Sequence, residues 1–167
     1  FYNCTNLGDF AIPATVTSIG RRAFYNCTSL EAVTIPEGIE AINAQRNSSP
    51  FERCSGLRQV TFNTPNVTTA LTGWIGNGQL QTGGITGIIL TGNVTGIGEY
   101  AFRSKSALTS IAIPGSVTGI GTQAFNGCTG LTGMVIPEGV ASIGSAAFGG
   151  CSNLISLSLP ETLSSLG

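Results

Sequence analysis

A segment of 23 residues recurs along the whole chain with the same residue types at the same offsets. The copy at 23–36 reads Ala-Phe-x-x-Cys-x-x-Leu-x-x-Val-x-Ile-Pro, and most copies continue with x-x-Val-x-x-Ile-Gly before the next Ala-Phe. A period of roughly 20 to 50 residues is typical of solenoids, in which each repeat buries its apolar face against its neighbours. The repeat therefore restricts the fold to a stack of similar coils.

The proline and aromatic positions define the register independently. The proline position is filled by Pro13, Pro36, Asn63, Thr91, Pro114, Pro137 and Pro160, with steps of 23, 27, 28, 23, 23 and 23 residues. The aromatic position is filled by Phe1, Phe24, Phe51, Trp74, Phe102, Phe125 and Phe148. These positions predict about seven coils, of which the two that contain the longer steps are irregular.

Each repeat predicts one strand before its proline. Val33 and Ile35 alternate with Ala32 and Thr34, which is the period of a half-buried strand, and Pro36 ends it because proline cannot donate to a ladder. Equivalent strands are expected at 10–12, 60–62, 88–90, 111–113, 134–136 and 157–159. Stacked once per coil, they would form a parallel sheet. The Ala-Phe-x-x-Cys segment is too short for an α-helix and predicts a single helical or 3₁₀ turn.

A glycine follows the second apolar pair of most repeats, at Gly20, Gly98, Gly121 and Gly144. A glycine at a fixed place predicts either a positive φ or a close approach between coils.

These motifs resemble the leucine-rich repeats of the BspA-like type, also called the Treponema pallidum type. The resemblance extends from Phe1 to Leu166. It implies a leucine-rich-repeat solenoid of the α/β horseshoe class, mainly β with short 3₁₀ turns and a parallel sheet on the concave face. It also implies a cell-surface or secreted protein with a role in adhesion.

The domain organisation is expected to be a single leucine-rich-repeat domain over 1–167, forming a piece of a longer chain. We expect irregular coils at 43–50 and 63–84, where extra residues interrupt the period. Residues 66–71 fit the second strand of the repeat poorly.

The composition argues against several partner classes. Charged residues make up 9% of the chain, against roughly 25% in an average domain, and the net charge is -1. Seven dispersed Lys and Arg residues do not form the basic stripe of a nucleic-acid surface. No apolar run has the roughly 18 residues of a membrane-spanning helix. The sequence therefore predicts neither nucleic-acid binding nor direct membrane insertion in this segment.

All five cysteines occupy one repeat position: Cys4, Cys27, Cys54, Cys128 and Cys151. Free cysteine packs as a small hydrophobe, so we expect a ladder of reduced, buried thiols. Disulfides between neighbouring coils remain an alternative, although parallel side chains give poor geometry. Lys105 replaces cysteine in one coil, and its ammonium is expected to reach solvent because burying a charge is costly.

Catalysis and metal binding have few candidate groups. Histidine is absent, there is no Cys-x-x-Cys, and the acidic residues are Asp9 and seven glutamates. Glu138 and Glu161, one repeat apart, indicate a surface stripe more than a glycosidase pair. We expect no enzyme, no cofactor and no metal.

Candidate binding residues fall into two groups. Gln59, Thr61, Ile89 and Ser110 are outward positions of the predicted sheet, and Arg46, Arg58 and Trp74 lie in or near the irregular steps. The sheet positions are small and almost uncharged, so they suit a flat partner. The register favours a core position for Trp74, with an interface anchor as the alternative.

The resemblance carries the functional hypotheses. The first is a protein-binding adhesion module whose ligand is a host extracellular protein or another cell-surface protein. The alternatives are a structural spacer and a carbohydrate-binding accessory to an enzyme elsewhere in the parent chain.

Overall fold

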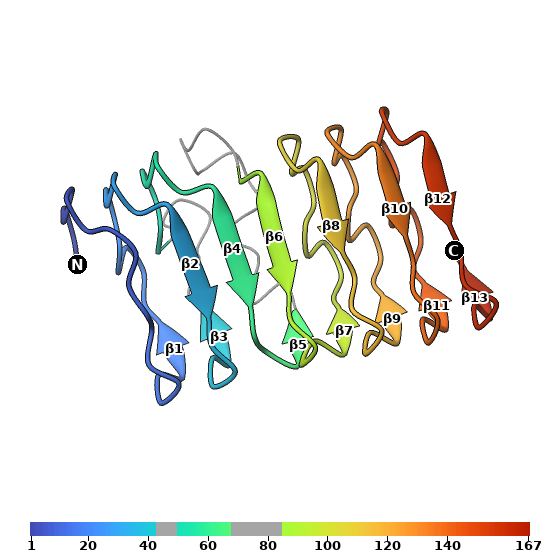
Figure 1. The fold of residues 1–167 in the computed structure, drawn as a ribbon, viewed down its shortest axis with the longest axis horizontal. Helices are drawn as coiled ribbons and strands as arrows, with labels where there is room; N and C mark the ends of the chain where they lie inside the picture. Colours follow the sequence, from blue (N-terminus) through green and yellow to red (C-terminus); the bar gives the residue numbers. More distant parts are fainter. Residues whose placement is uncertain (43–49, 68–84) are drawn as a thin grey trace.

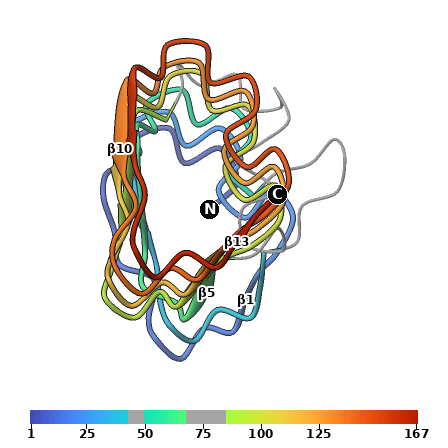
Figure 2. The same cartoon turned by 90° about the vertical axis from the view of Figure 1, so that its right-hand side faces the viewer.

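The computed structural model describes residues 1–42, 50–67 and 85–167, and these form a solenoid (Figure 1). The coils stack side by side along the long axis, with the two termini at opposite ends. Two rows of strands run along the stack on different sides of the coil (Figure 2). The predicted solenoid with parallel strands is therefore confirmed.

The longer strands form the first row, one per coil. They are β2 (Ala32–Ile35), β4 (Gln59–Phe62), β6 (Gly87–Leu90), β8 (Ser110–Ala112), β10 (Gly133–Val135) and β12 (Ser156–Ser158). All pairs are parallel, but the row is divided into a four-stranded sheet, β2-β4-β6-β8, and a two-stranded sheet, β10-β12. The strand row therefore has a break between β8 and β10.

The shorter strands form the second row, each of two residues. They are β1 (Ser18–Ile19), β3 (Ala41–Ile42), β5 (Asn66–Val67), β7 (Gly96–Ile97), β9 (Gly119–Ile120), β11 (Ser142–Ile143) and β13 (Ser165–Leu166). This row is also divided, into β1-β3 and β5-β7-β9-β11-β13. Asn66 and Val67 were expected to fit the second strand poorly, yet they pair with Gly96 and Ile97, so the irregular coil keeps this strand.

The first coil departs from the prediction. The expected strand at 10–12 is absent, so the first coil contributes only β1. The Asp9 carboxylate accepts a hydrogen bond from the Ala32 N–H at 3.1 Å. That side chain takes a main-chain donor of β2 that a strand neighbour would otherwise use.

Burial along the strands follows the predicted alternation. In β2, Val33 and Ile35 are buried and Thr34 is exposed. The register places Thr34 beside Thr61, and Thr61 beside Ile89, so the outward positions form a continuous face over β2, β4 and β6.

The third side of each coil is built from tight turns. In the second coil the N–H of Tyr25 donates to the Arg22 carbonyl at 3.1 Å, and the N–H of Cys27 donates to that of Phe24 at 3.3 Å. Arg22 and Asn26 have positive φ of 53° and 57°, which interrupts helical geometry after one turn. Amides between these turns donate to the next coil, as from Phe24 to the Pro50 carbonyl at 2.8 Å.

The repeated glycine serves close approach and not a positive φ. A Cβ on Gly121 would lie 2.5 Å from the Glu99 nitrogen in the preceding coil. The positive φ angles lie elsewhere. Apart from Gly139, they occur two residues before the aromatic position or two after it, as at Gln123 and Gly127 around Phe125.

The core is a column of side chains along the solenoid axis. Phe24 stacks on Phe51 with 5.0 Å between ring centroids, and Phe125 stacks on Phe102 at 5.3 Å. Phe51, Phe102 and Phe125 are fully buried. Inward strand residues surround this column, so each coil contributes the same few apolar side chains.

Candidate protein-binding surface

Four of the predicted binding residues lie together on the outer face of the sheet. Gln59 and Thr61 are on β4, Ile89 on β6 and Ser110 on β8. Thr61 is in register with Ile89, whereas Gly87 lies in register between Gln59 and Ser110. Arg46 and Trp74 lie outside the described residues.

Arg58 is held beside this face by its own turn. Its Nη1 donates to the main-chain carbonyls of Ser55 at 2.7 Å and Leu57 at 3.2 Å. The residue is exposed, immediately before β4. These bonds fix the guanidinium at the rim of the sheet and leave part of it open to a partner.

Two aliphatic side chains project from this otherwise small and polar face. Ile89 is 45% exposed and Val135 is 69% exposed, whereas their neighbours Ala112 and Ser158 are small. An exposed aliphatic residue among small ones provides a contact point for a flat partner.

The break between β8 and β10 was not predicted from the sequence. No backbone hydrogen bond joins these strands, although both lie wholly in the described part of the chain. The same coils remain joined on the other two sides. There β9 pairs with β11, and the Phe102 N–H donates to the Ala124 carbonyl at 2.7 Å.

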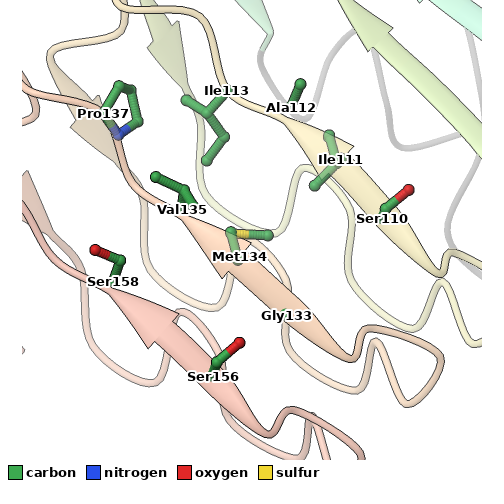
Figure 3. Close-up of a pocket in the computed structure, with 10 residues that line it drawn as sticks. All are labelled: Ser110, Ile111, Ala112, Ile113, Gly133, Met134, Val135, Pro137, Ser156 and Ser158. Atoms are coloured by element: carbon green, nitrogen blue, oxygen red, sulfur yellow. The ribbon is translucent and has the colours of Figure 1, made fainter.

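We call this break the seam, and a cavity of about 540 Å³ opens over it (Figure 3). Its lining consists of Ser110, Ile111, Ala112, Ile113, Gly133, Met134, Val135, Pro137, Ser156 and Ser158. The inward-facing side chains below the seam remain buried, because Ile111 and Ile113 are each 8% exposed, as is Leu90 on the paired strand β6.

The period of the repeat does not signal the seam. The step between Pro114 and Pro137 is the regular 23 residues. Gly133 does not explain the break, because Gly87 occupies the same position in β6, which pairs on both sides. The coil that carries β8 does depart from the repeat at Lys105, which is buried where other coils have cysteine.

A second cluster on the turn side was also missed. The rings of Tyr2 and Tyr25 stack 4.6 Å apart, and the guanidiniums of Arg22 and Arg53 lie 5.3 and 5.5 Å from the Tyr25 ring centroid. Arg22 Nε also donates to Glu52 at 3.0 Å. The two tyrosines, one repeat apart, were the available signal, whereas the two arginines occupy different repeat positions.

The cysteine ladder is held by hydrogen bonds from thiol to main chain. The Cys54 thiol donates to the Phe24 carbonyl in the preceding coil, and the Cys128 thiol donates to the Phe102 carbonyl in the same way. Each of these sulfur–oxygen distances is 3.0 Å. Burial raises the pKa of Cys54 to about 12 and that of Cys128 to about 11.

All five cysteines are free, as expected, but they are not all buried. Cys4 is exposed and Cys151 is only partly buried. Both belong to end coils of the described stack, where a neighbour covers one side only.

Lys105 corrects another expectation, because its side chain does not reach freely into solvent. The residue is 7% exposed. Burial lowers the pKa of its ammonium to about 8, with the nearby Cys128 acting weakly in the opposite direction. No ion pair to Lys105 occurs among the described residues.

Two further properties can be stated for the described ranges. Within 1–42, 50–67 and 85–167, no helix has the length and apolar character needed to cross a bilayer. The same residues contain no group of three or more His, Cys, Asp or Glu side chains arranged to hold a metal ion.

Solved structures with similar folds come from bacteria. A leucine-rich repeat protein from Bacteroides ovatus aligns with 95% of this chain and 38% of its own, at 32% identity and a TM-score of 0.71. The leucine-rich repeat protein of T. pallidum aligns with 90% of this chain and 66% of its own, at 26% identity and a TM-score of 0.60. A leucine-rich cell surface protein from Faecalibacterium prausnitzii, at 20% identity, aligns with 98% of this chain and 56% of its own, with a TM-score of 0.51.

The chain therefore spans less than two thirds of each of these proteins. No curated protein matches the sequence. The model of the BspA type leucine-rich repeat region matches residues 1–73 and 73–167, in six copies. Together with the coil geometry, this match shows that the chain belongs to the BspA-type leucine-rich repeat family.

Proposed function

We propose that this chain is a protein-binding module of a cell-surface or secreted protein, with an adhesive role towards host or neighbouring cells. The observation that carries the proposal is the outer face of β4, β6 and β8, where the small residues Thr61 and Ala112 flank the exposed Ile89. A flat face of this kind fits a protein partner by shape and hydrogen bonding. One structural relative is described as a cell surface protein, which agrees with this location.

The partner would contact Gln59, Thr61, Ile89 and Ser110, with Arg58 at the rim. The predicted residues Arg46 and Trp74 belong to the same proposal through the two inserts. Because the chain carries a net charge of -1, we expect its affinity to depend weakly on salt.

Binding to immobilised extracellular-matrix proteins from cultured epithelial cells tests this proposal. The double variant Gln59→Glu/Ser110→Glu adds two charges to the face without touching the core. Its matched control is Ser106→Glu, an exposed position on the turn of the coil that carries β8.

We expect saturable binding that the double variant abolishes and the control retains. Equal binding by both variants would move the site away from the sheet. Absence of saturable binding to matrix proteins and to intact cells would overturn the proposal in favour of a spacer.

A further inference from the structure

The seam leaves main-chain groups of β8 and β10 without strand partners. In a regular pair such as β4 and β6, the Gly87 N–H donates to the Arg58 carbonyl. By the same register, the N–H groups of Gly133 and Val135 would donate to Thr109 and Ile111. The Gly133 bond is absent, and β8 and β10 are not paired as neighbouring strands.

The opposite direction of pairing is missing as well. Between β10 and β12 the Ile136 N–H donates to the Ser158 carbonyl at 3.0 Å. The equivalent donor beside β8 is the N–H of Ile113, which directly follows the strand and would donate to the Val135 carbonyl. In the same way, the Ile111 N–H would donate to the Gly133 carbonyl. Two parallel strand edges therefore face one another with alternating donors and acceptors that no described backbone group satisfies.

We propose that the seam is an acceptor site for an extended strand of a partner polypeptide. The inference rests on the proposed protein-binding function but names a different site. An extended main chain carries donors and acceptors at the spacing of these edges, and pairing with it would join β2-β4-β6-β8 and β10-β12 into one sheet.

The lining defines the side chains of the partner strand. Inward positions would meet Ile111, Ile113 and Met134, so aliphatic residues fit there. Outward positions would lie between Ala112 and Val135, where small or polar residues fit. A strand with aliphatic residues at alternate positions and no charge on its inward side satisfies both requirements.

Admission of a strand requires β8 and β10 to stand about 9.6 Å apart, twice the usual strand spacing. In the structure their Cα atoms approach within 8 Å, so the two coils have to move apart on this side to admit it. The coils can separate on this side alone, because no hydrogen bond has to break between β8 and β10. The pairing of β9 with β11 would hold the two coils together on the other side.

A suitable probe is a synthetic peptide with the sequence of residues 153–160, which contains β12. In the protein this strand pairs with the other edge of β10, with Leu157 in register with Met134. Its aliphatic residues alternate with Ser156 and Ser158. The control peptide has the same sequence but carries N-methyl groups at alternate amides, which removes main-chain donors and keeps the side chains.

The readout is amide hydrogen exchange at Ile111, Ile113, Gly133 and Val135. In the free protein we expect these amides to exchange faster than that of Val60 in the paired β4. The peptide should slow all four at least about tenfold, whereas the N-methylated peptide should not. Ala112→Trp adds bulk over the seam and should weaken the protection, whereas Thr34→Trp, at the equivalent position of β2, should not.

Slow exchange at these four amides in the free protein would show a closed seam and overturn the proposal. Peptide binding without their protection, or no protection at saturating peptide, would overturn it equally. The protein can fail to bind matrix proteins while the peptide still protects the four amides, and it can bind matrix proteins while the peptide gives no protection. The two experiments therefore test the two proposals independently.

Discussion

The rings of Phe125 and Phe148 stack with 5.4 Å between their centroids and 1° between their planes. Phe102 covers the other side of Phe125, which has no exposed surface. Replacement of Phe125 by alanine removes a ring that two coils contact. We expect a loss of about 3 to 5 kcal/mol in the free energy of unfolding, measured by urea denaturation. A loss below about 1.5 kcal/mol would contradict this account of the core.

The cysteine ladder predicts graded thiol reactivity. The thiolate is the reactive species, and burial raises the pKa of Cys27, Cys54 and Cys128. In a thiol titration of native protein we expect Cys4 to react first and Cys151 more slowly, with the three buried thiols reacting only after denaturation. A disulfide found by mass spectrometry under non-reducing conditions, or equal reaction of all five, would refute the ladder.

Lys105 makes stability depend on pH in a defined window. The pKa of its ammonium is about 8 in the folded protein, and we take the ordinary value of 10.5 for the unfolded chain. Between pH 8 and pH 10.5 the unfolded chain therefore binds more protons than the folded protein. Stability contributed by this site therefore rises with pH from about 8 to 10.5 and is lowest below pH 8. The raised pKa values of Cys54 and Cys128 have the opposite effect, because they lower stability as the pH rises above 9. A variant of Lys105 is therefore needed to isolate the contribution of the lysine.

We expect Lys105→Met to be more stable than wild type at pH 7, by about 1.4 kcal/mol for each unit by which the pKa is lowered. The difference should shrink towards pH 10.5. Urea denaturation at several pH values measures it, with Arg103→Met as an exposed control. A difference that does not change with pH would show that the lysine acts by packing alone.

Gly20 and Gly121 occupy the same repeat position but have different surroundings, so the effects of alanine at the two sites can be compared. A Cβ on Gly121 would meet the backbone of Gly98 and Glu99, whereas a Cβ on Gly20 would have nothing within 4 Å. Gly121→Ala should therefore lower the free energy of unfolding by about 1 to 3 kcal/mol. Gly20→Ala should change it by no more than about 0.5 kcal/mol, and a similar loss at both sites would argue against coil approach as the reason for glycine.

The two inserts remain candidates for binding. Shortening 43–50 to the regular four residues, or removing five residues within 76–84, should leave the melting temperature within a few degrees, because coils interact mainly with neighbours. We expect weaker binding to matrix proteins, because departures from a repeat often carry function. If the shortened variants keep their affinity and Gln59→Glu/Ser110→Glu loses binding, the site lies on the sheet alone.

Much of the fold was predictable because one pattern specifies every coil. The alternation of Val33, Thr34 and Ile35 gave the strand and its buried face, and the observed strands lie within one residue of those expected, except at 10–12. The exception depends on the Asp9 side chain reaching Ala32, a contact between coils that the repeat does not encode.

The candidate site was only partly predictable, for a related reason. Register gave the shared face of Gln59, Thr61, Ile89 and Ser110, because it follows from position in the repeat. The seam depends on the spacing of two coils whose sequences follow the regular period. The burial of Lys105 was missed because the cost of a buried ammonium predicted the opposite, whereas the fold lowers its pKa.

The breaks in the two strand rows fall at different places along the solenoid. The short row is interrupted between β3 and β5, where β2 and β4 remain paired, and the long row is interrupted between β8 and β10, where β9 and β11 remain paired. Because the two breaks are staggered, no plane between two coils passes through both of them. At each of these two junctions one paired ladder therefore still joins the coils, so pulling them apart along the axis requires strand hydrogen bonds to break.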